Sequence, residues 1–214
     1  SIKNLIEKGI AILCLQNGIG NGDIVRNATK NKCLVLRGLT SFGAAYFEPG
    51  TIQLSNYGAT VIEESQKSED LLDIFNKCKL NTSISLDINK DVWKKVVANC
   101  IINPLTAILR VENKYIANKN LNPIKKLIID ECLNVAEKEG IKFDIDFIKT
   151  VNEIVKDSNN ISSMLQDLMK GNKTELDYLN GAIVRLGKKY GIKCPINEGL
   201  ARIIKEMEKM NASF

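Results

Sequence analysis

The hydrophobic pattern of residues 1–88 predicts alternating strands and helices. A continuous apolar run at 10–15 (IAILCL), bounded by glycine and asparagine, is typical of a parallel strand that is covered on both faces. Residues 1–8 have the pattern of a helix end that stops at Gly9. The same reasoning predicts further strands at 33–36, 51–55, 60–62 and 82–86, and helices at 23–30 and 67–79.

Two segments rich in small residues follow predicted strands. Residues 16–22 (QNGIGNG) and 38–48 (GLTSFGAAYFE) are expected to be loops, and residues 56–58 (NYG) a turn that joins the strands at 51–55 and 60–62. Open α/β sheets bind ligands beyond the carboxyl ends of their strands, which is where both loops would lie. Ordinary turns have the same composition, so the loops alone leave both interpretations open.

Near residue 88 the pattern changes, and every later segment is helical or irregular. A long helix is predicted at 91–109. Pro104 should kink it or make it restart, because proline lacks an N–H and crowds the preceding turn. We therefore expect an α/β domain at 1–88 and an all-helical domain at 89–214. The other predicted helices lie at 123–139, 146–156, 162–169, 174–190 and 197–210.

Three polar residues recur on the predicted helix at 91–109. Lys95, Asn99 and Asn103 are spaced four residues apart, which places them on one face of an otherwise apolar helix. In one interpretation, the asparagines bond neighbouring helices and the lysine reaches to water. In the other, they form a site for an anion or a carbonyl group, where the lysine supplies charge and a proton and the carboxamides orient a polar substrate.

Further polar candidates lie in the segment 160–184. Ser163 is near a predicted helix start, and Glu175 is in the first turn of the following predicted helix. Ser163 could therefore simply cap its helix, and the charge of Glu175 could simply complement the helix dipole. Gly181 interrupts a strong helical pattern at a cost of about 1 kcal/mol relative to alanine. This cost predicts close packing against the helix at 91–109.

Composition narrows the classes of function. The 214 residues include 30 basic and 25 acidic side chains, so the net charge of +5 is small. The sequence has no basic stripe with interleaved aromatic residues, so we do not expect it to bind nucleic acid. No apolar run has membrane-spanning length, and none of the six cysteines forms a C-x-x-C pair. We therefore expect a cytoplasmic protein with free thiols.

The sequence contains no histidine. The commonest general acid–base residue and the commonest metal ligand are therefore absent, and we expect no metal site. Proton transfer near neutral pH must come from lysine, a carboxylate, tyrosine or cysteine. The absence of histidine thus strengthens Lys95 as a candidate acid.

Four strings of residues resemble ketopantoate reductases, also called 2-dehydropantoate 2-reductases, in their order and in the gaps between them. They are LQNGIGN at 15–21, WKKVVANCIINPLTAIL at 93–109, NISSMLQDLMKGNKTELDYLNGAIV at 160–184 and GIKCPIN at 191–197. The resemblance implies the C-terminal portion of a Rossmann-type NAD(P)-binding domain. A helical C-terminal domain like that of 6-phosphogluconate dehydrogenase would follow it, with the substrate between the two.

The resemblance further implies NADPH-dependent reduction of ketopantoate to pantoate, a step in the biosynthesis of pantothenate and coenzyme A. Lys95 would be the catalytic general acid, donating a proton to the keto oxygen as hydride reaches the carbon. Partial burial should lower the pKa of Lys95, and a nearby Glu175 should oppose that shift. The other implied contacts are Asn99, Asn103, Asn113 and Ser163 with the substrate, and Asn17, Ala44 and Glu175 with the cofactor.

One departure from the family is large. The G-x-G-x-x-G turn that seats a pyrophosphate at a helix N-terminus has no counterpart in this sequence. We therefore expect the first βα units, and with them the phosphate half of the cofactor site, to be missing, which could leave the chain inactive on its own. Two alternatives remain: a reductase of another branched 2-keto acid on the same fold, and a non-catalytic helical fragment for interaction or dimerisation. The apolar helices also allow a homodimer.

Overall fold

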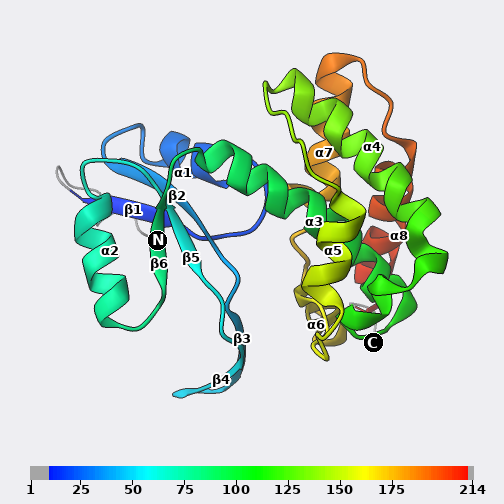
Figure 1. Cartoon of the computed structure of the whole chain (residues 1–214), viewed down its shortest axis with the longest axis horizontal. Helices are drawn as coiled ribbons and strands as arrows, with labels where there is room; N and C mark the ends of the chain where they lie inside the picture. The colour runs from blue at the N-terminus through cyan, green and yellow to red at the C-terminus, as the bar shows by residue number, and fades with distance from the viewer. Residues whose placement is uncertain (1–9, 212–214) are drawn as a thin grey trace. The chain divides into compact units, whose positions relative to one another are not determined.

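A computed structural model describes residues 10–211, with the backbone alone at 45–47, 55 and 211 (Figure 1). The chain divides into two compact units, Ser1–Val92 and Trp93–Phe214, named here the sheet unit and the helical unit. Helix α3 (Ile88–Leu109) begins where the sequence predicts the first domain to end, and it contributes to both units. The helix end predicted at 1–8 lies outside the described residues.

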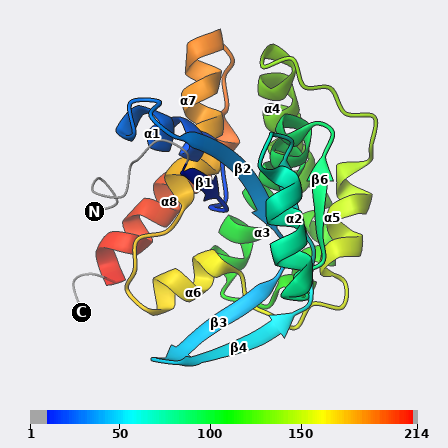
Figure 2. The ribbon, with the colours of Figure 1, turned by 90° about the vertical axis from the view of Figure 1, so that its left-hand side faces the viewer.

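The sheet unit is an α/β structure, as predicted. Its main elements are β1 (Ala11–Cys14), α1 (Asn21–Ala28), β2 (Leu34–Thr40), β5 (Thr60–Glu63), α2 (Ser68–Lys77) and β6 (Thr82–Ser85). The strands form a mixed sheet in the order β1-β2-β5-β6, in which β2 and β5 are antiparallel and the other two pairs parallel. Figure 2 labels β1, β2 and β6 of this sheet. The predicted parallel strand is confirmed in β1, but Cys14 is its only buried residue, so the predicted cover on both faces is incomplete.

A separate two-stranded antiparallel ribbon, β3 (Gly43–Glu48) with β4 (Thr51–Asn56), overturns two predictions. The predicted loop at 38–48 is wrong, because β2 continues to Thr40 and β3 starts at Gly43. The predicted pairing of 51–55 with 60–62 is also wrong, since β5 pairs with β2 and β6 instead. The two-residue connection at 49–50 explains the choice, because a short hairpin closes more readily and Gly50, at φ 86°, takes the left-handed conformation.

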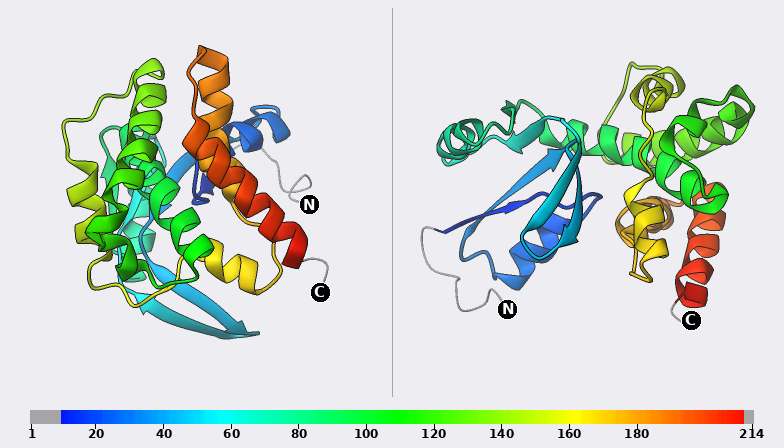
Figure 3. Two further views of the ribbon diagram at one scale, coloured as in Figure 1. Left: turned by 90° about the vertical axis from the view of Figure 1, so that its right-hand side faces the viewer. Right: turned by 90° about the horizontal axis from the view of Figure 1, so that it is seen from below.

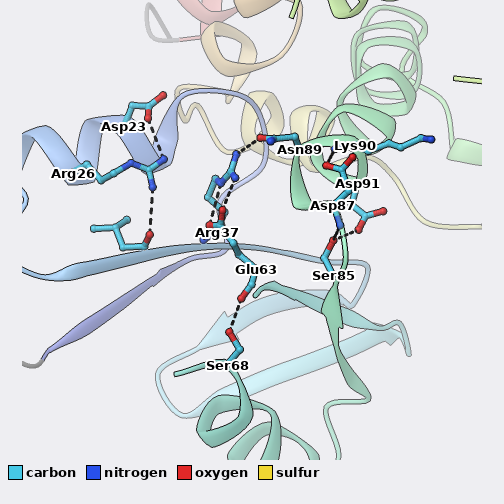
Figure 4. Close-up of polar contacts among 11 residues, drawn as sticks. Asp23, Arg26, Arg37, Glu63, Ser68, Ser85, Asp87, Asn89, Lys90 and Asp91 are labelled. Atoms are coloured by element: carbon cyan, nitrogen blue, oxygen red, sulfur yellow. Dashed lines mark hydrogen bonds and ion pairs between the residues drawn. The ribbon is translucent and has the colours of Figure 1, made fainter. Parts of the chain in front are cut away.

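Polar contacts attach the first turn of α3 to the strands before it (Figure 4). Arg37 donates to the Glu63 carboxylate from its backbone N at 2.9 Å and its Nε at 3.2 Å, and to Oδ1 of Asn89 from Nη1 at 2.7 Å. Ser85 donates to Oδ2 of Asp91 at 2.5 Å. Burial opposes ionisation of Glu63, but its hydrogen bonds with Arg37 and the charge of that guanidinium leave the pKa lowered. The sheet unit therefore holds the start of the helix.

The helical unit contains no strand in its described part, 93–211, which confirms the predicted all-helical fold (Figure 3). Ile101, Ile128, Val151, Ile183 and Ile204 are fully buried and form the centre of its core. After α3 the unit contains α4 (Asn122–Lys138), α5 (Phe147–Val155), α6 (Ser163–Met169), α7 (Asn180–Tyr190) and α8 (Pro195–Asn211), with 3-10 helices η2 (Asn113–Ala117), η3 (Lys119–Leu121) and η4 (Leu176–Tyr178).

Helix α3 runs through Pro104 without a break, so the predicted restart is wrong. The helix is long and apolar enough to cross a membrane by these two criteria alone, with a mean hydropathy of 1.2 over its most apolar window. However, 67% of that window is buried inside the protein. A helix that is apolar on all sides is typical of the core of a globular unit, and packing by its own chain accounts for its hydropathy.

The single helix predicted at 174–190 is two elements, η4 and α7. The backbone breaks at Leu179, where φ is −109° and ψ is −110°. Gly181 approaches the carbonyl oxygen of Leu176, which would lie 3.1 Å from an added Cβ. The predicted packing of Gly181 against the helix at 91–109 is therefore wrong, because the neighbouring backbone is that of the preceding turn.

Candidate functional site

Helix α3 carries the predicted polar stripe through an apolar environment. Val96 and Val97 beside it are 1% and 0% exposed, and Asn103 at its far end is 5% exposed. Lys95 and Asn99 are half-buried. The stripe therefore runs from a partly accessible ammonium to a buried carboxamide, and burying such groups costs free energy unless they are hydrogen-bonded or paired with a charge.

The ammonium of Lys95 interacts electrostatically with Glu175. Burial lowers the pKa of Lys95 from its ordinary value, and the negative charge of Glu175 counters part of that effect. Both directions agree with those expected from the sequence. A lysine with a lowered pKa gives up its proton more readily near neutral pH, as a general acid in a reduction must.

Glu175 itself lies just before η4, in a segment held from α8. The backbone N and Oγ1 of Thr174 donate to Oε1 of Glu208 at 2.8 and 2.6 Å. Glu175 is the N-cap residue of η4 and makes no side-chain capping hydrogen bond there, while the alternative role in which its charge complements a helix dipole stays a prediction. Burial and the charge of Glu175 also raise the pKa of Asp167, which shows that a second carboxyl group lies within its field.

Ser163 is the first residue of α6, but its neighbour Ser162 is the cap. The Ser162 hydroxyl accepts a hydrogen bond from the backbone N of Leu165 at 3.2 Å, whereas the Ser163 side chain is exposed. Thr106 of α3 and Ser162 share a buried hydroxyl–hydroxyl hydrogen bond of 2.7 Å. The start of α6 is thereby fastened to α3 three residues after Asn103.

Asn113 opens η2 and is held by the segment that leads to Ser163. Its backbone N donates to the carbonyl of Asn160 at 2.8 Å. Within the described residues its Oδ1 is buried without a hydrogen-bond partner. A buried acceptor without a donor is unfavourable, and among the described residues Asn122 and Asn180 have an Oδ1 in the same state, so this feature is not specific to the predicted substrate contact.

A fully buried lysine stabilises the same turn. Lys125 of α4 is 0% exposed, and its Nζ donates to the carbonyl of Ile116 at 2.7 Å and to Oδ1 of Asn152 at 2.8 Å. Burial lowers the pKa of this lysine. Its two hydrogen bonds join η2 to α4 and α5, so the position of Asn113 depends on three elements.

The two predicted cofactor contacts Asn17 and Ala44 belong to the sheet unit. Asn17 follows the carboxyl end of β1 and its carbonyl accepts a hydrogen bond from Nδ2 of Asn21 at 2.8 Å. Gly18 and Gly20, at φ 98° and 99°, shape the loop that enters α1. A glycine loop between a parallel strand and a helix fits one part of a dinucleotide site. Ala44 is exposed on β3.

The predicted residues of the helical unit are thus linked through short connections. Three of them, Lys95, Asn99 and Asn103, lie on α3. The charge of Glu175 affects the pKa of Lys95. Ser163 directly follows Ser162, which is hydrogen-bonded to α3. Thr106, Asp167 and Asn180 lie within the sequence motifs, but the sequence predicted no role for them. Thr106 and Asn180 act through contacts with distant segments, which no local pattern reveals.

Two family models match the sequence. Residues 87–208 match the model described as the C terminal of ketopantoate reductase PanE/ApbA, and residues 1–67 match that of ketopantoate reductase PanE/ApbA. The 2-dehydropantoate 2-reductase of Archaeoglobus fulgidus is 33% identical, over 96% of this chain and 71% of that relative. The 2-dehydropantoate 2-reductase of Pyrococcus abyssi is 35% identical, over 96% of this chain and 70% of that relative.

Solved structures agree in fold. A PanE/ApbA family ketopantoate reductase from Ralstonia eutropha JMP134 has a TM-score of 0.90 at 28% identity, covering 98% of this chain and 70% of that one. A D-mandelate dehydrogenase in a ternary structure with NADH and anilino(oxo)acetate also has a TM-score of 0.90, at 29% identity, covering 98% of this chain and 71% of that one.

Proposed function

The chain belongs to the ketopantoate reductase family, and on this premise we propose that it reduces 2-dehydropantoate to pantoate, with NADPH as the hydride donor. The reaction would serve pantothenate and coenzyme A biosynthesis in the cytoplasm. The observation that carries the proposal is the half-buried Lys95, on a helix that also presents Asn99 and Asn103. Burial lowers the pKa of Lys95, and the charge of Glu175 opposes that lowering.

Lys95 is the proposed general acid. Reduction of a ketone places negative charge on its oxygen, and an ammonium directed at that oxygen stabilises the charge and donates the proton. A bound reduced nicotinamide supplies the hydride that the keto carbon accepts. Glu175 keeps the lysine protonated at a higher pH than burial alone would allow.

The remaining site residues would orient the substrate. Asn99 and Asn103 offer carboxamides along the same face as Lys95, and Ser163 offers an exposed hydroxyl at the start of α6. We propose Asn113, the first residue of η2, as the fourth contact with the substrate. Four fixed polar groups of this kind hold the keto carbon in one orientation, which is a large part of the rate enhancement in such reactions.

The glycine loop after β1 is partial support for the proposal that the protein binds a nicotinamide cofactor. We infer that Asn17, Ala44 and Glu175 contact it. Gly18 and Gly20 allow the backbone of this loop to turn without a side chain in the way. The choice of NADPH over NADH rests on the family resemblance alone, so both dinucleotides belong in every assay.

A second candidate function is NADH-linked reduction of another 2-keto acid. The D-mandelate dehydrogenase that shares the fold at 29% identity favours this alternative. Turnover should be compared for ketopantoate, a smaller branched 2-keto acid and the aromatic keto acid that corresponds to mandelate, each with NADPH and NADH. A higher kcat/KM for ketopantoate with NADPH supports the proposal, whereas a preference for an aromatic or other branched acid replaces it.

Lys95→Ala should lower kcat about 10²- to 10⁴-fold, the usual contribution of a positioned acid. Cofactor affinity should change little, because the lysine is proposed to act on the substrate. The measurement is oxidation of the reduced nicotinamide by the purified protein, with cofactor binding followed by fluorescence. The matched control is Lys94→Ala, since Lys94 is adjacent in sequence but exposed.

Near-normal turnover in Lys95→Ala would remove the lysine from the role of acid. Absence of turnover in the wild-type protein with every keto acid, together with no cofactor binding, would favour the non-catalytic interaction or dimerisation module instead. A homodimer stays a prediction, which sedimentation of the purified protein can test.

A further inference from the structure

Pro104 leaves one carbonyl of α3 without its usual donor. In an α-helix the carbonyl of residue i accepts a hydrogen bond from the N–H of residue i+4. For Cys100 that residue is Pro104, which has no N–H. Cys100 is 0% exposed, so bulk solvent does not reach it, and a buried carbonyl left without a donor is unfavourable.

The side chain of Asn180 supplies the missing donor. Its Nδ2 donates to the carbonyl oxygen of Cys100 at 3.0 Å, although the two residues are 80 positions apart. Asn180 is the first residue of α7 and is 0% exposed. A carboxamide of α7 therefore takes the place of a backbone N–H in α3.

The orientation of the Asn180 amide follows from its neighbours. Glu131 accepts hydrogen bonds from the backbone N and Nδ2 of Asn197 at 2.9 and 2.7 Å, so Oδ1 of Asn197 faces the other way. That Oδ1 accepts the second hydrogen bond from Nδ2 of Asn180, at 2.9 Å. Because both partners of Asn180 are acceptors, its nitrogen must point toward Cys100.

This arrangement has a cost. Among the described residues, Oδ1 of Asn180 is buried without a hydrogen-bond partner. A carboxamide kept in the core despite an unsatisfied acceptor indicates that its donor does something that an apolar residue could not do. The carbonyl that receives the donor lies directly after Asn99 and three residues before Asn103.

We propose that Asn180 is a positioning residue, which replaces the donor that Pro104 lacks and thereby orients the turn of α3 that carries Asn99 and Asn103. The proposal rests on the function proposed above for these asparagines. Without the Asn180 donor, the carbonyl of Cys100 would turn toward other partners, and the two carboxamides would move relative to Lys95. Asn180 itself need not touch the substrate.

The test is a double-mutant cycle between positions 104 and 180. Pro104→Ala restores the N–H that reaches the Cys100 carbonyl, so it should make the Asn180 donor redundant. We expect Asn180→Ala to lower kcat/KM about 10- to 100-fold in the wild-type background, and by less than about threefold when Pro104→Ala is also present. Asn122→Ala is the matched control, since Oδ1 of Asn122 is also buried without a partner in the described region.

A purely structural role for Asn180 would give a different result. The bond to Asn197 is lost in both backgrounds, so the fall in melting temperature from Asn180→Ala should persist with Pro104→Ala, while the loss of kcat/KM should not. An equal loss of kcat/KM in both backgrounds overturns the proposal. Should Asn180→Ala fail to fold, Asn180→Leu, which keeps the side-chain volume but has no donor, takes its place in both backgrounds, and the same two outcomes for kcat/KM support or overturn the proposal.

A readout without catalysis separates this proposal from the proposed function. Amide hydrogen exchange of residues 99–103 in the 214-residue chain should accelerate in Asn180→Ala and return toward the wild-type rate in the double variant. Unchanged exchange in the single variant overturns the positioning role. If wild-type protein reduces no keto acid but the exchange pattern holds, the proposed function fails while the structural link between Asn180 and α3 stands.

Discussion

At the scale of single residues, neighbours in sequence have different roles. Lys94 is exposed and Lys95 is half-buried with a lowered pKa. Ser162 caps α6 and bonds to Thr106, which leaves the exposed Ser163 hydroxyl for another partner. In both pairs one residue serves structure or solvent and the other is the residue proposed for the site, a distinction that residue type alone does not make.

The electrostatic coupling of Lys95 to Glu175 predicts a shift in pH dependence. Lys95 must be protonated to act as an acid, so activity should fall as the pH rises through its pKa. Glu175 raises that pKa, and Glu175→Gln should therefore move the alkaline limb of kcat/KM to lower pH. The measurement is a pH profile of kcat/KM for the keto acid at saturating cofactor.

The control for this shift is Asp177→Asn. Asp177 is two residues from Glu175, but its carboxylate pairs with Lys205 at 2.8 Å. Removing the negative charge of Asp177 should leave the alkaline limb of the kcat/KM profile at the same pH. An unmoved limb in Glu175→Gln, or a movement to higher pH, would contradict the coupling.

At the scale of elements, close packing decides how the helices can be changed. Gly187 in α7 has Sγ of Cys194 and the carbonyl oxygen of Ile192 at 2.7 and 2.8 Å from where a Cβ would stand. Gly199 in α8 has nothing within 4 Å of that point. Two helical glycines in adjacent elements thus occupy opposite environments.

The same substitution should therefore have opposite effects at these positions. Gly187→Ala should lower the free energy of unfolding by about 1–3 kcal/mol, because the methyl group overpacks the turn between α7 and α8. Gly199→Ala should raise it by about 0.5–1 kcal/mol, since alanine is the better helix former and the space is free. Urea unfolding of both variants measures the difference, and a stabilised Gly187→Ala would show that the turn adjusts.

At the scale of the whole molecule, the chain consists of two units with separate cores. Buried residues of the helical unit, such as Val97, Ile128 and Ile204, lie within Trp93–Phe214. The proposed acid and substrate contacts lie in that unit, whereas Asn17 and Ala44 lie in the sheet unit. Catalysis as proposed requires both units, but folding of the helical unit should not.

A fragment of residues 88–214 should therefore fold alone. We expect a helical circular-dichroism spectrum and one cooperative unfolding transition, because the fragment keeps α3 and all the helices that follow it. A fragment of residues 110–214, which lacks α3, is the control and should not unfold cooperatively. Loss of cooperativity in the longer fragment would show that the helical unit depends on the sheet unit.

Local patterns in the sequence predicted a substantial part of this structure. They predicted the change from α/β to all-helical structure near residue 88, most element positions, and the stripe of Lys95, Asn99 and Asn103 on one helix. Such features depend on periodicities of two and 3.6 residues, which nearby positions determine on their own. The absence of histidine, together with the place of Lys95 in this stripe, likewise makes Lys95 the leading candidate acid.

Only the tertiary structure decided which distant segments meet. It pairs β4 with β3 rather than with β5, and it breaks the expected helix at Leu179. It also directs Asn180 to a carbonyl 80 residues away and fastens Thr106 to Ser162 across 56 residues. These contacts arise where buried polar groups must find partners, and the available partner depends on how all the helices pack. The sequence therefore determines which groups the site contains, and the packing determines how they are held.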